Sequence, residues 1–122
     1  MALSVSPSEL EIMKVIWKQP GIGASEIANA LEDRKDWNIR TIKTLLARLV
    51  EKGALETQLE GRRYLYRPLI NQNDYRKSAA GQFVDRVFGG RAAPLVAHLA
   101  DARGLTNQDI EELEDLLREL KS

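Results

Sequence analysis

The chain has 122 residues, of which 43% are hydrophobic and 30% charged, a balance typical of one folded domain or one domain with an appendage. It has no cysteine, which excludes disulfides, thiolate metal sites and cysteine nucleophiles and fits a reducing cytoplasm. Its 18 basic and 18 acidic side chains cancel, and it shows neither a leader nor an apolar run of about 18 residues. Indiscriminate polyanion binding and membrane insertion are therefore not expected.

The first helix is predicted from a capping box at its start. Ser6 is the N-cap, Pro7 occupies the first helical position, where no backbone donor is needed, and Glu9 completes the box. The apolar residues that follow at helical spacing, and that we expect to be buried, are Leu10, Met13, Ile16 and Trp17. The helix ends before Pro20.

Two further helices are expected, a short one over residues 25–32 and a longer one over residues 39–52. Asn38 is a favoured N-cap type, and Gly53 stands where a left-handed residue usually ends a helix. The longer helix has an apolar side that requires a core: Ile42, Leu45, Leu46, Leu49 and Val50. Its other side is mostly basic or small: Arg40, Lys43, Thr44, Ala47 and Arg48.

A β-hairpin follows this helix. Residues 55–59 and 62–67 have partly alternating character and flank Glu60-Gly61, a two-residue turn signal. Helix, short helix, helix and hairpin in this order predict a winged helix-turn-helix domain over residues 1–70. The expected fold class is mainly α with a small β-hairpin.

Residues 71–122 are predicted to form three helices that act as a dimerisation region. The first two cover residues 74–88 and 92–102, and a capping box of Thr106 with Asp109 opens the third. In the last helix the apolar residues have the 3, 4, 3 spacing of a seam between two helices. The expected dimer contacts are Phe83, Val87, Leu95, Leu99, Ile110, Leu113, Leu117 and Leu120. About fifty residues without disulfide or metal rarely hold a fold alone, so a second copy is the expected support. The alternative is that this region packs on the winged domain of its own chain.

Charge is segregated along the chain although the total is zero. Residues 38–67 contain seven basic against three acidic side chains, whereas residues 104–122 contain six acidic against two basic ones. Local sign decides which surface meets a phosphate, because charges are screened beyond about 8–10 Å. The basic stretch includes the polar side of the helix over residues 39–52.

That polar side suits double-stranded DNA. A helix about 10–12 Å wide fits the major groove, where Arg and Lys bind guanine or phosphate and Thr binds phosphate or touches a thymine methyl. Ala47 is small enough to let the helix approach the bases. The predicted DNA-binding residues, the last two at the hairpin tip, are Arg40, Thr41, Lys43, Thr44, Ala47, Arg48, Arg62 and Arg63.

Other classes of function find less support in the residues. His98 has no metal-ligand spacing around it, and the acids of the last helix lack a calcium-binding loop, so neither an enzyme nor a metal or cofactor site is expected. Two alternatives stay open: a ligand-sensing winged-helix regulator with an effector pocket between its domains, and a winged-helix protein-interaction module.

The chain resembles the penicillinase-repressor family, the BlaI, MecI and CopY type of bacterial repressors. The resemblance rests on EIMKVIW, KDWNIRTIKTLLARLVEKGAL, GRRYLYRPL and QDIEELEDLLREL, and on the pattern Trp-x-x-x-Thr-x-x-Thr-x-x-x-Arg-Leu-x-x-Lys-Gly from Trp37 to Gly53. It implies a cytoplasmic homodimer that binds a palindromic operator with TACA/TGTA-like half-sites through the helix of residues 39–52 of each subunit.

Two departures from the family pattern concern induction. Copper-responsive members carry Cys-x-Cys motifs, which this chain lacks, so copper sensing through thiolates is excluded. In β-lactam-responsive members a membrane-linked protease cuts an Asn-Phe bond in the helix that corresponds to residues 95–101. The matching pair here is His98-Leu99, the candidate proteolytic induction site.

Overall fold

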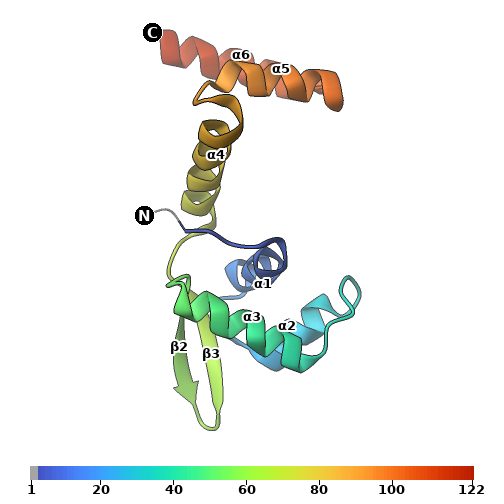
Figure 1. Cartoon of the computed structure of the whole chain (residues 1–122), viewed down its shortest axis with the longest axis vertical. Helices are drawn as coiled ribbons and strands as arrows, with labels where there is room; N and C mark the ends of the chain where they lie inside the picture. The colour runs from blue at the N-terminus through green and yellow to red at the C-terminus, as the bar shows by residue number, and fades with distance from the viewer. Residues whose placement is uncertain (1–2) are drawn as a thin grey trace. The chain divides into compact units, whose positions relative to one another are not determined.

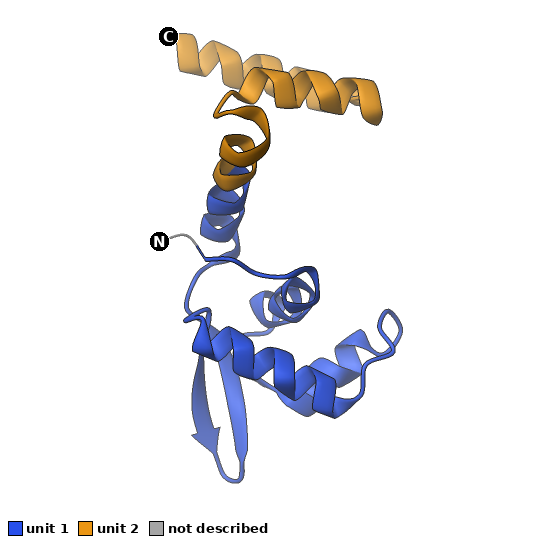
Figure 2. Ribbon diagram, viewed as in Figure 1, with its two compact units in different colours: residues 1–80 blue, residues 81–122 orange. Residues whose placement is uncertain are grey.

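The structure, a computed structural model, describes residues 3–122 and forms two compact units (Figure 2). The first unit extends to Ala80 and the second covers residues 81–122. In chain order the elements are α1 (Pro7–Lys18), β1 (Ile22–Gly23), α2 (Ala24–Leu31), α3 (Ile39–Glu51), β2 (Leu55–Glu60), β3 (Arg63–Pro68), α4 (Gln72–Phe88), α5 (Ala92–Ala102) and α6 (Asn107–Lys121) (Figure 1). The predicted class, mainly α with a small β-hairpin, is confirmed.

Helix ends form where local sequence predicts them. The Ser6 hydroxyl accepts a hydrogen bond from the Glu9 backbone N–H at 3.2 Å, and the Glu9 carboxylate accepts one from the Ser6 N–H at 2.8 Å. The Asn38 side chain caps α3 by accepting a hydrogen bond from the Thr41 N–H at 2.9 Å, and Gly53 after the helix has a φ of 82°. α4 begins two residues earlier than predicted, because the Asn71 side chain accepts from the Asp74 N–H at 2.8 Å and caps it.

One hydrophobic core holds the first unit together. The side chains that lie fully buried in it come from α1, α2, α3 and β2, and the largest are Ile12, Met13, Ile16, Ile27, Leu31, Ile42, Leu46, Leu49 and Leu55. Burying side chains of this size contributes about 1.5–3 kcal/mol each relative to leaving them exposed. The core therefore fixes α3 on its apolar side and leaves its other side free.

The sheet contains one strand that the sequence did not predict. Its strand order is β1-β3-β2, with antiparallel pairs Ile22↔Tyr66 and Gly23↔Leu65 between β1 and β3. β1 has only two residues, which is too short for an alternating pattern to appear. The hairpin of β2 and β3 projects away from the helices of this unit (Figure 1).

The hairpin turn lies one residue later than predicted. Glu60 pairs with Arg63, so the turn residues are Gly61 and Arg62, not Glu60 and Gly61. Gly61 has a φ of 64°, and no residue other than glycine has a positive φ in the described range. A type II′ turn needs glycine at its first central position only, whereas type I′ needs a positive φ at both. The prediction was wrong because the glycine was taken as the second turn residue.

α4 is attached to α1 through an aromatic contact. The indole N–H of Trp17 donates to the Ile70 carbonyl at 2.9 Å. The Trp17 and Tyr75 rings lie 5.6 Å apart. The start of α4 is thus held on the first unit.

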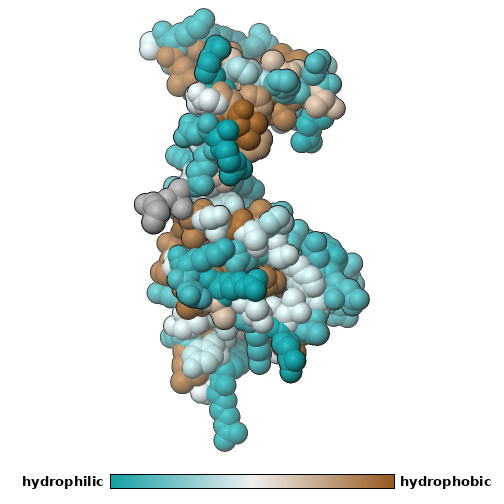
Figure 3. All heavy atoms as spheres, in the orientation of Figure 1, coloured by the Kyte–Doolittle hydropathy of each residue, from teal (hydrophilic) through white to brown (hydrophobic). Residues whose placement is uncertain are grey.

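The helices of the second unit bury little of their apolar surface within the chain. No residue of α4, α5 or α6 is buried. Phe83 is 40% exposed, Leu117 55% and Leu120 73%. Apolar side chains accordingly reach the surface of this unit (Figure 3). Over residues 3–122, no helix combines the length and apolarity needed to cross a bilayer.

Candidate nucleic-acid interface

The outward side of α3 carries a row of exposed polar and small residues. Arg40, Lys43, Thr44, Ala47 and Arg48 are exposed, and Thr41 is half-buried. The opposite side of the helix is packed in the core. We call these six residues and their helix surface the α3 face. Its three cations point away from a rigid support, which is the arrangement that groove binding requires.

The two threonines of the α3 face already use their hydroxyl protons. Thr41 Oγ1 donates to Asn38 Oδ1 at 3.2 Å, and Thr44 Oγ1 donates to the Arg40 carbonyl at 3.0 Å. Phosphate oxygens accept hydrogen bonds, so neither threonine can donate to one in this conformation. The Thr44 methyl group can still contact a thymine methyl while the hydroxyl keeps its hydrogen bond to the Arg40 carbonyl.

The structure separates the two arginines that the sequence places together at the hairpin tip. Arg62 lies in the turn and is exposed. Arg63 lies in β3, and its two guanidinium nitrogens contact the Glu26 carboxylate at 2.6 and 3.2 Å. Hydrogen bonding from Arg63 is the main reason that the pKa of Glu26 is lowered. Arg62 is therefore the freer of the two cations.

A groove of about 310 Å³ joins α3, the start of α2 and the hairpin. Three predicted residues, Lys43, Arg62 and Arg63, line the groove. Ser25 and Tyr64, which the sequence reasoning missed, line it as well. Ser25 lies in the first turn of α2, where backbone N–H groups favour anions, and Tyr64 is 55% exposed. The sequence feature that could have identified Tyr64 is its position in the second strand of the hairpin. No sequence signal ties Ser25 to residues some 18 or more positions away.

The predicted dimerisation residues and the predicted cleavage pair lie on α4, α5 and α6. Phe83, Val87, Leu99, Ile110, Leu117 and Leu120 are exposed, and Leu95 and Leu113 are half-buried. His98 is exposed and lies on α5, with its ring 5.6 Å from the Phe88 ring. Within the described part of the chain, no cluster of three or more His, Asp or Glu residues could hold a metal ion.

A family model and a sequence relative point to the same family. Residues 5–119 match the penicillinase repressor family. A penicillinase repressor of Bacillus licheniformis is 36% identical over 118 residues, which are 97% of this chain and 92% of that protein. The match therefore covers both units.

Two solved structures resemble about 60% of the chain. The DNA-binding domain of the repressor BlaI is 43% identical with a TM-score of 0.55, over 62% of this chain and 92% of that one. The monomeric form of Bacillus licheniformis BlaI in complex with the blaP half-operator is 44% identical with a TM-score of 0.51, over 59% and 88%. Both support the winged-helix fold.

Proposed function

The chain belongs to the penicillinase repressor family, and on this premise we propose that it acts as a homodimer that occupies a palindromic operator. It is a bacterial DNA-binding transcriptional repressor and not an enzyme. The proposal adds the dimer, the operator symmetry and the residues that contact DNA.

The α3 face is the observation that carries the proposal. Arg40, Lys43 and Arg48 are exposed on a helix whose other side is buried, and Ala47 between them adds no bulk. In this arrangement the cations bind phosphate or guanine, and the small residue permits close approach. Arg62, at the turn of the hairpin, is proposed to bind the flanking backbone.

The exposed apolar residues of the second unit support the dimer. A groove of about 650 Å³ between α5 and α6 has both apolar and charged residues in its lining, and the apolar ones include Val96, Leu99, Leu113 and Leu116. Three helices without a buried residue need a partner to remove this surface from water. A two-fold dimer would present two α3 faces to half-sites about 34 Å apart, one turn of DNA.

The site of action that we propose is the cytoplasm, where the operator lies. A protease that releases this repressor would cut the bond between His98 and Leu99. That bond lies inside α5, so the helix has to unwind locally before cleavage.

Sequencing of genomic DNA that co-purifies with the full chain tests the proposal. We expect enrichment of a dyad with TACA/TGTA-like half-sites, and loss of this enrichment for Lys43→Glu. Lys121→Glu makes the same charge change on α6 and should leave the recovered sites unchanged. Recovery of DNA without any shared motif, together with loss of a protein partner for Lys43→Glu, would favour an interaction module instead.

A further inference from the structure

A second basic site lies in the first unit, apart from the α3 face. It is a pocket of about 660 Å³ lined by residues of α1 and α2, the loop after each helix, and the start of α4. Its polar lining consists of four cations and two amides, Lys14, Lys18, Arg34, Arg76, Gln19 and Gln72. The apolar remainder is Val15 and Ala30, and no acidic residue lines the pocket.

The cations of this pocket are poorly neutralised. Among the ion pairs within residues 3–122, one reaches the pocket, between Arg34 and Glu11, with a long separation of 4.0 Å. Lys14, Lys18 and Arg76 take part in none of them. Gathering like charges from α1, the loop after α2 and the start of α4 costs free energy, and nothing in the core requires it. A bound anion would remove this repulsion.

The walls of the pocket are held in place. In the sequence, Trp17 lies between the pocket residues Val15 and Lys18 of α1. Its contacts with Ile70 and Tyr75 fix the start of α4 against this helix. The backbone that carries Gln72 and Arg76 is therefore positioned before any ligand arrives. Preorganised donors bind anions more tightly, because less side-chain and backbone freedom is lost.

We propose that this pocket binds a small molecule that carries two or more adjacent phosphate groups. Its volume is that of small-molecule sites, about 300–1,000 Å³. Lysine ammonium and arginine guanidinium groups are the side chains that pair with phosphate, and the two amides add N–H donors. Four cations match the charge of a diphosphate or triphosphate.

A concave site favours a small ligand over a DNA backbone. The pocket shares no residue with the groove lined by Lys43, Arg62 and Tyr64. Binding there is thus independent of the operator that we propose, and failure of one inference leaves the other standing.

The test is isothermal titration of the full chain with inorganic tripolyphosphate at constant ionic strength. Wild type should bind one tripolyphosphate per chain, and Lys18→Gln/Arg76→Gln should weaken binding by about tenfold or more through loss of charge-assisted hydrogen bonds. Both side chains are exposed, so the core is unchanged, and a thermal melt checks the fold. Lys14→Gln serves as an independent second variant with an effect in the same direction.

The matched control is Lys43→Gln/Arg48→Gln, which removes two charges from the α3 face. It should change the tripolyphosphate affinity by less than about twofold, since long-range charge effects are screened at ordinary salt. Equal weakening by both double variants, or no saturable binding to wild type, would overturn the proposal. So would a loss of DNA affinity in the pocket variant as large as in the control, because DNA would then be the occupant.

Discussion

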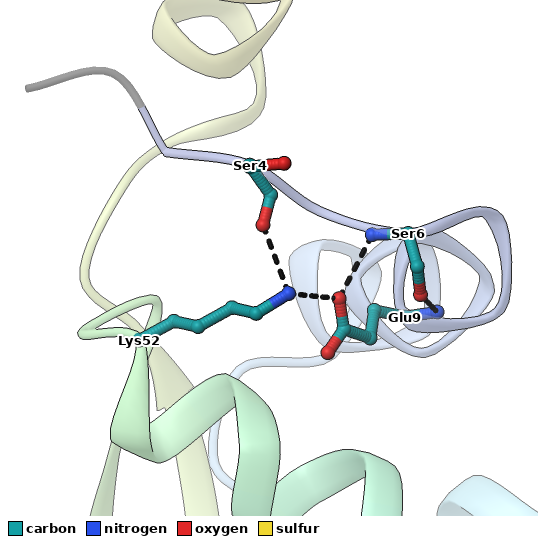
Figure 4. Close-up of polar contacts among 4 residues, drawn as sticks. All are labelled: Ser4, Ser6, Glu9 and Lys52. Carbon is teal, nitrogen blue, oxygen red and sulfur yellow. Dashed lines mark hydrogen bonds and ion pairs between the residues drawn. The ribbon is translucent and has the colours of Figure 1, made fainter.

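Lys52 Nζ, at the end of α3, lies 2.5 Å from Glu9 Oε1 and 2.9 Å from the Ser4 carbonyl oxygen (Figure 4). Glu9 is 1% exposed. Burial raises the pKa of its carboxyl, but hydrogen bonds from Lys52 and Ser6 and the Lys52 charge together lower it below the ordinary value. The end of the helix that presents the α3 face is thus tied to the beginning of α1.

Replacement of Lys52 by methionine should destabilise the first unit by about 2–3 kcal/mol, because a buried carboxylate loses its charged partner. The apolar stem is preserved, so the change isolates the ion pair. Urea unfolding of the full chain, followed by circular dichroism, measures the difference in the free energy of unfolding.

Two further variants serve as controls for this ion pair. Lys43→Met removes an exposed lysine that makes no ion pair within the described residues, and should cost less than about 0.5 kcal/mol. Glu9→Gln/Lys52→Met removes both charges and should recover part of the loss. A Lys52→Met variant as stable as wild type would contradict the role of the pair.

Acid should weaken the fold through Glu9. Because its folded pKa lies below the ordinary value of 4.5, its contribution to stability is present above about pH 4.5 and is lost as the pH falls through the folded pKa. The Glu9→Gln variant lacks this titration, so its free energy of unfolding should fall less steeply between about pH 5 and about pH 3. Parallel curves for the two proteins would rule Glu9 out as the source.

Lys43 is predicted to distinguish the operator from other DNA. Lys43→Ala should weaken binding to the preferred site by about 1–3 kcal/mol, with a smaller loss on random DNA, if its ammonium contacts a base. Fluorescence anisotropy with both duplexes at one salt concentration measures this. An equal loss on both would identify a phosphate contact instead.

Salt dependence should separate the two arginines of the hairpin. Each subunit has five candidate DNA-binding cations, Arg40, Lys43, Arg48, Arg62 and Arg63. If about six to ten of the ten in a dimer meet phosphate, the logarithm of the binding constant should fall with log salt at a slope of about −5 to −9. Arg62→Gln should reduce the magnitude of the slope by about 2, one contact per subunit. Arg63→Gln should change it by less than about 1, because Glu26 already binds that guanidinium. Equal effects would show that Arg63 leaves Glu26 on the DNA, and a slope near zero would remove the electrostatic basis of binding.

The dimer should depend on the apolar side of α6. Leu117 is 55% exposed in the single chain, so Leu117→Glu should leave the subunit folded while weakening self-association by about 2 kcal/mol or more through burial of a charge. Sedimentation velocity at several concentrations measures the association. Gln108→Glu adds the same carboxylate elsewhere on α6 and should have little effect. A Leu117→Glu dimer as tight as wild type would exclude this surface.

Local signals predicted most of the first unit. The caps at Ser6 and Asn38 and the stop at Gly53 depend on neighbours within a few positions, and each was confirmed. The long polar face of α3 could also be read, because helical spacing separates it from the core residues. Its exposure follows directly from that spacing.

Long-range features escaped the sequence. The Glu26–Arg63 pair joins residues 37 positions apart and the Glu9–Lys52 pair residues 43 apart, and no periodicity links such positions. β1 exists only because β3 offers it hydrogen bonds. The basic pocket is likewise visible only when α1, α2 and α4 are brought together.

The environment of Trp17 allows its intrinsic fluorescence to report on the start of α4. The chain has two tryptophans, and Trp37→Phe would leave Trp17 as the single tryptophan. The Trp17 indole N–H donates a hydrogen bond to the Ile70 carbonyl, just before α4, and the Trp17 ring lies against the Tyr75 ring. Loss of these two contacts would expose the indole to water and shift its emission to the red. The rate at which the first turns of α4 unwind can therefore be measured without an attached dye.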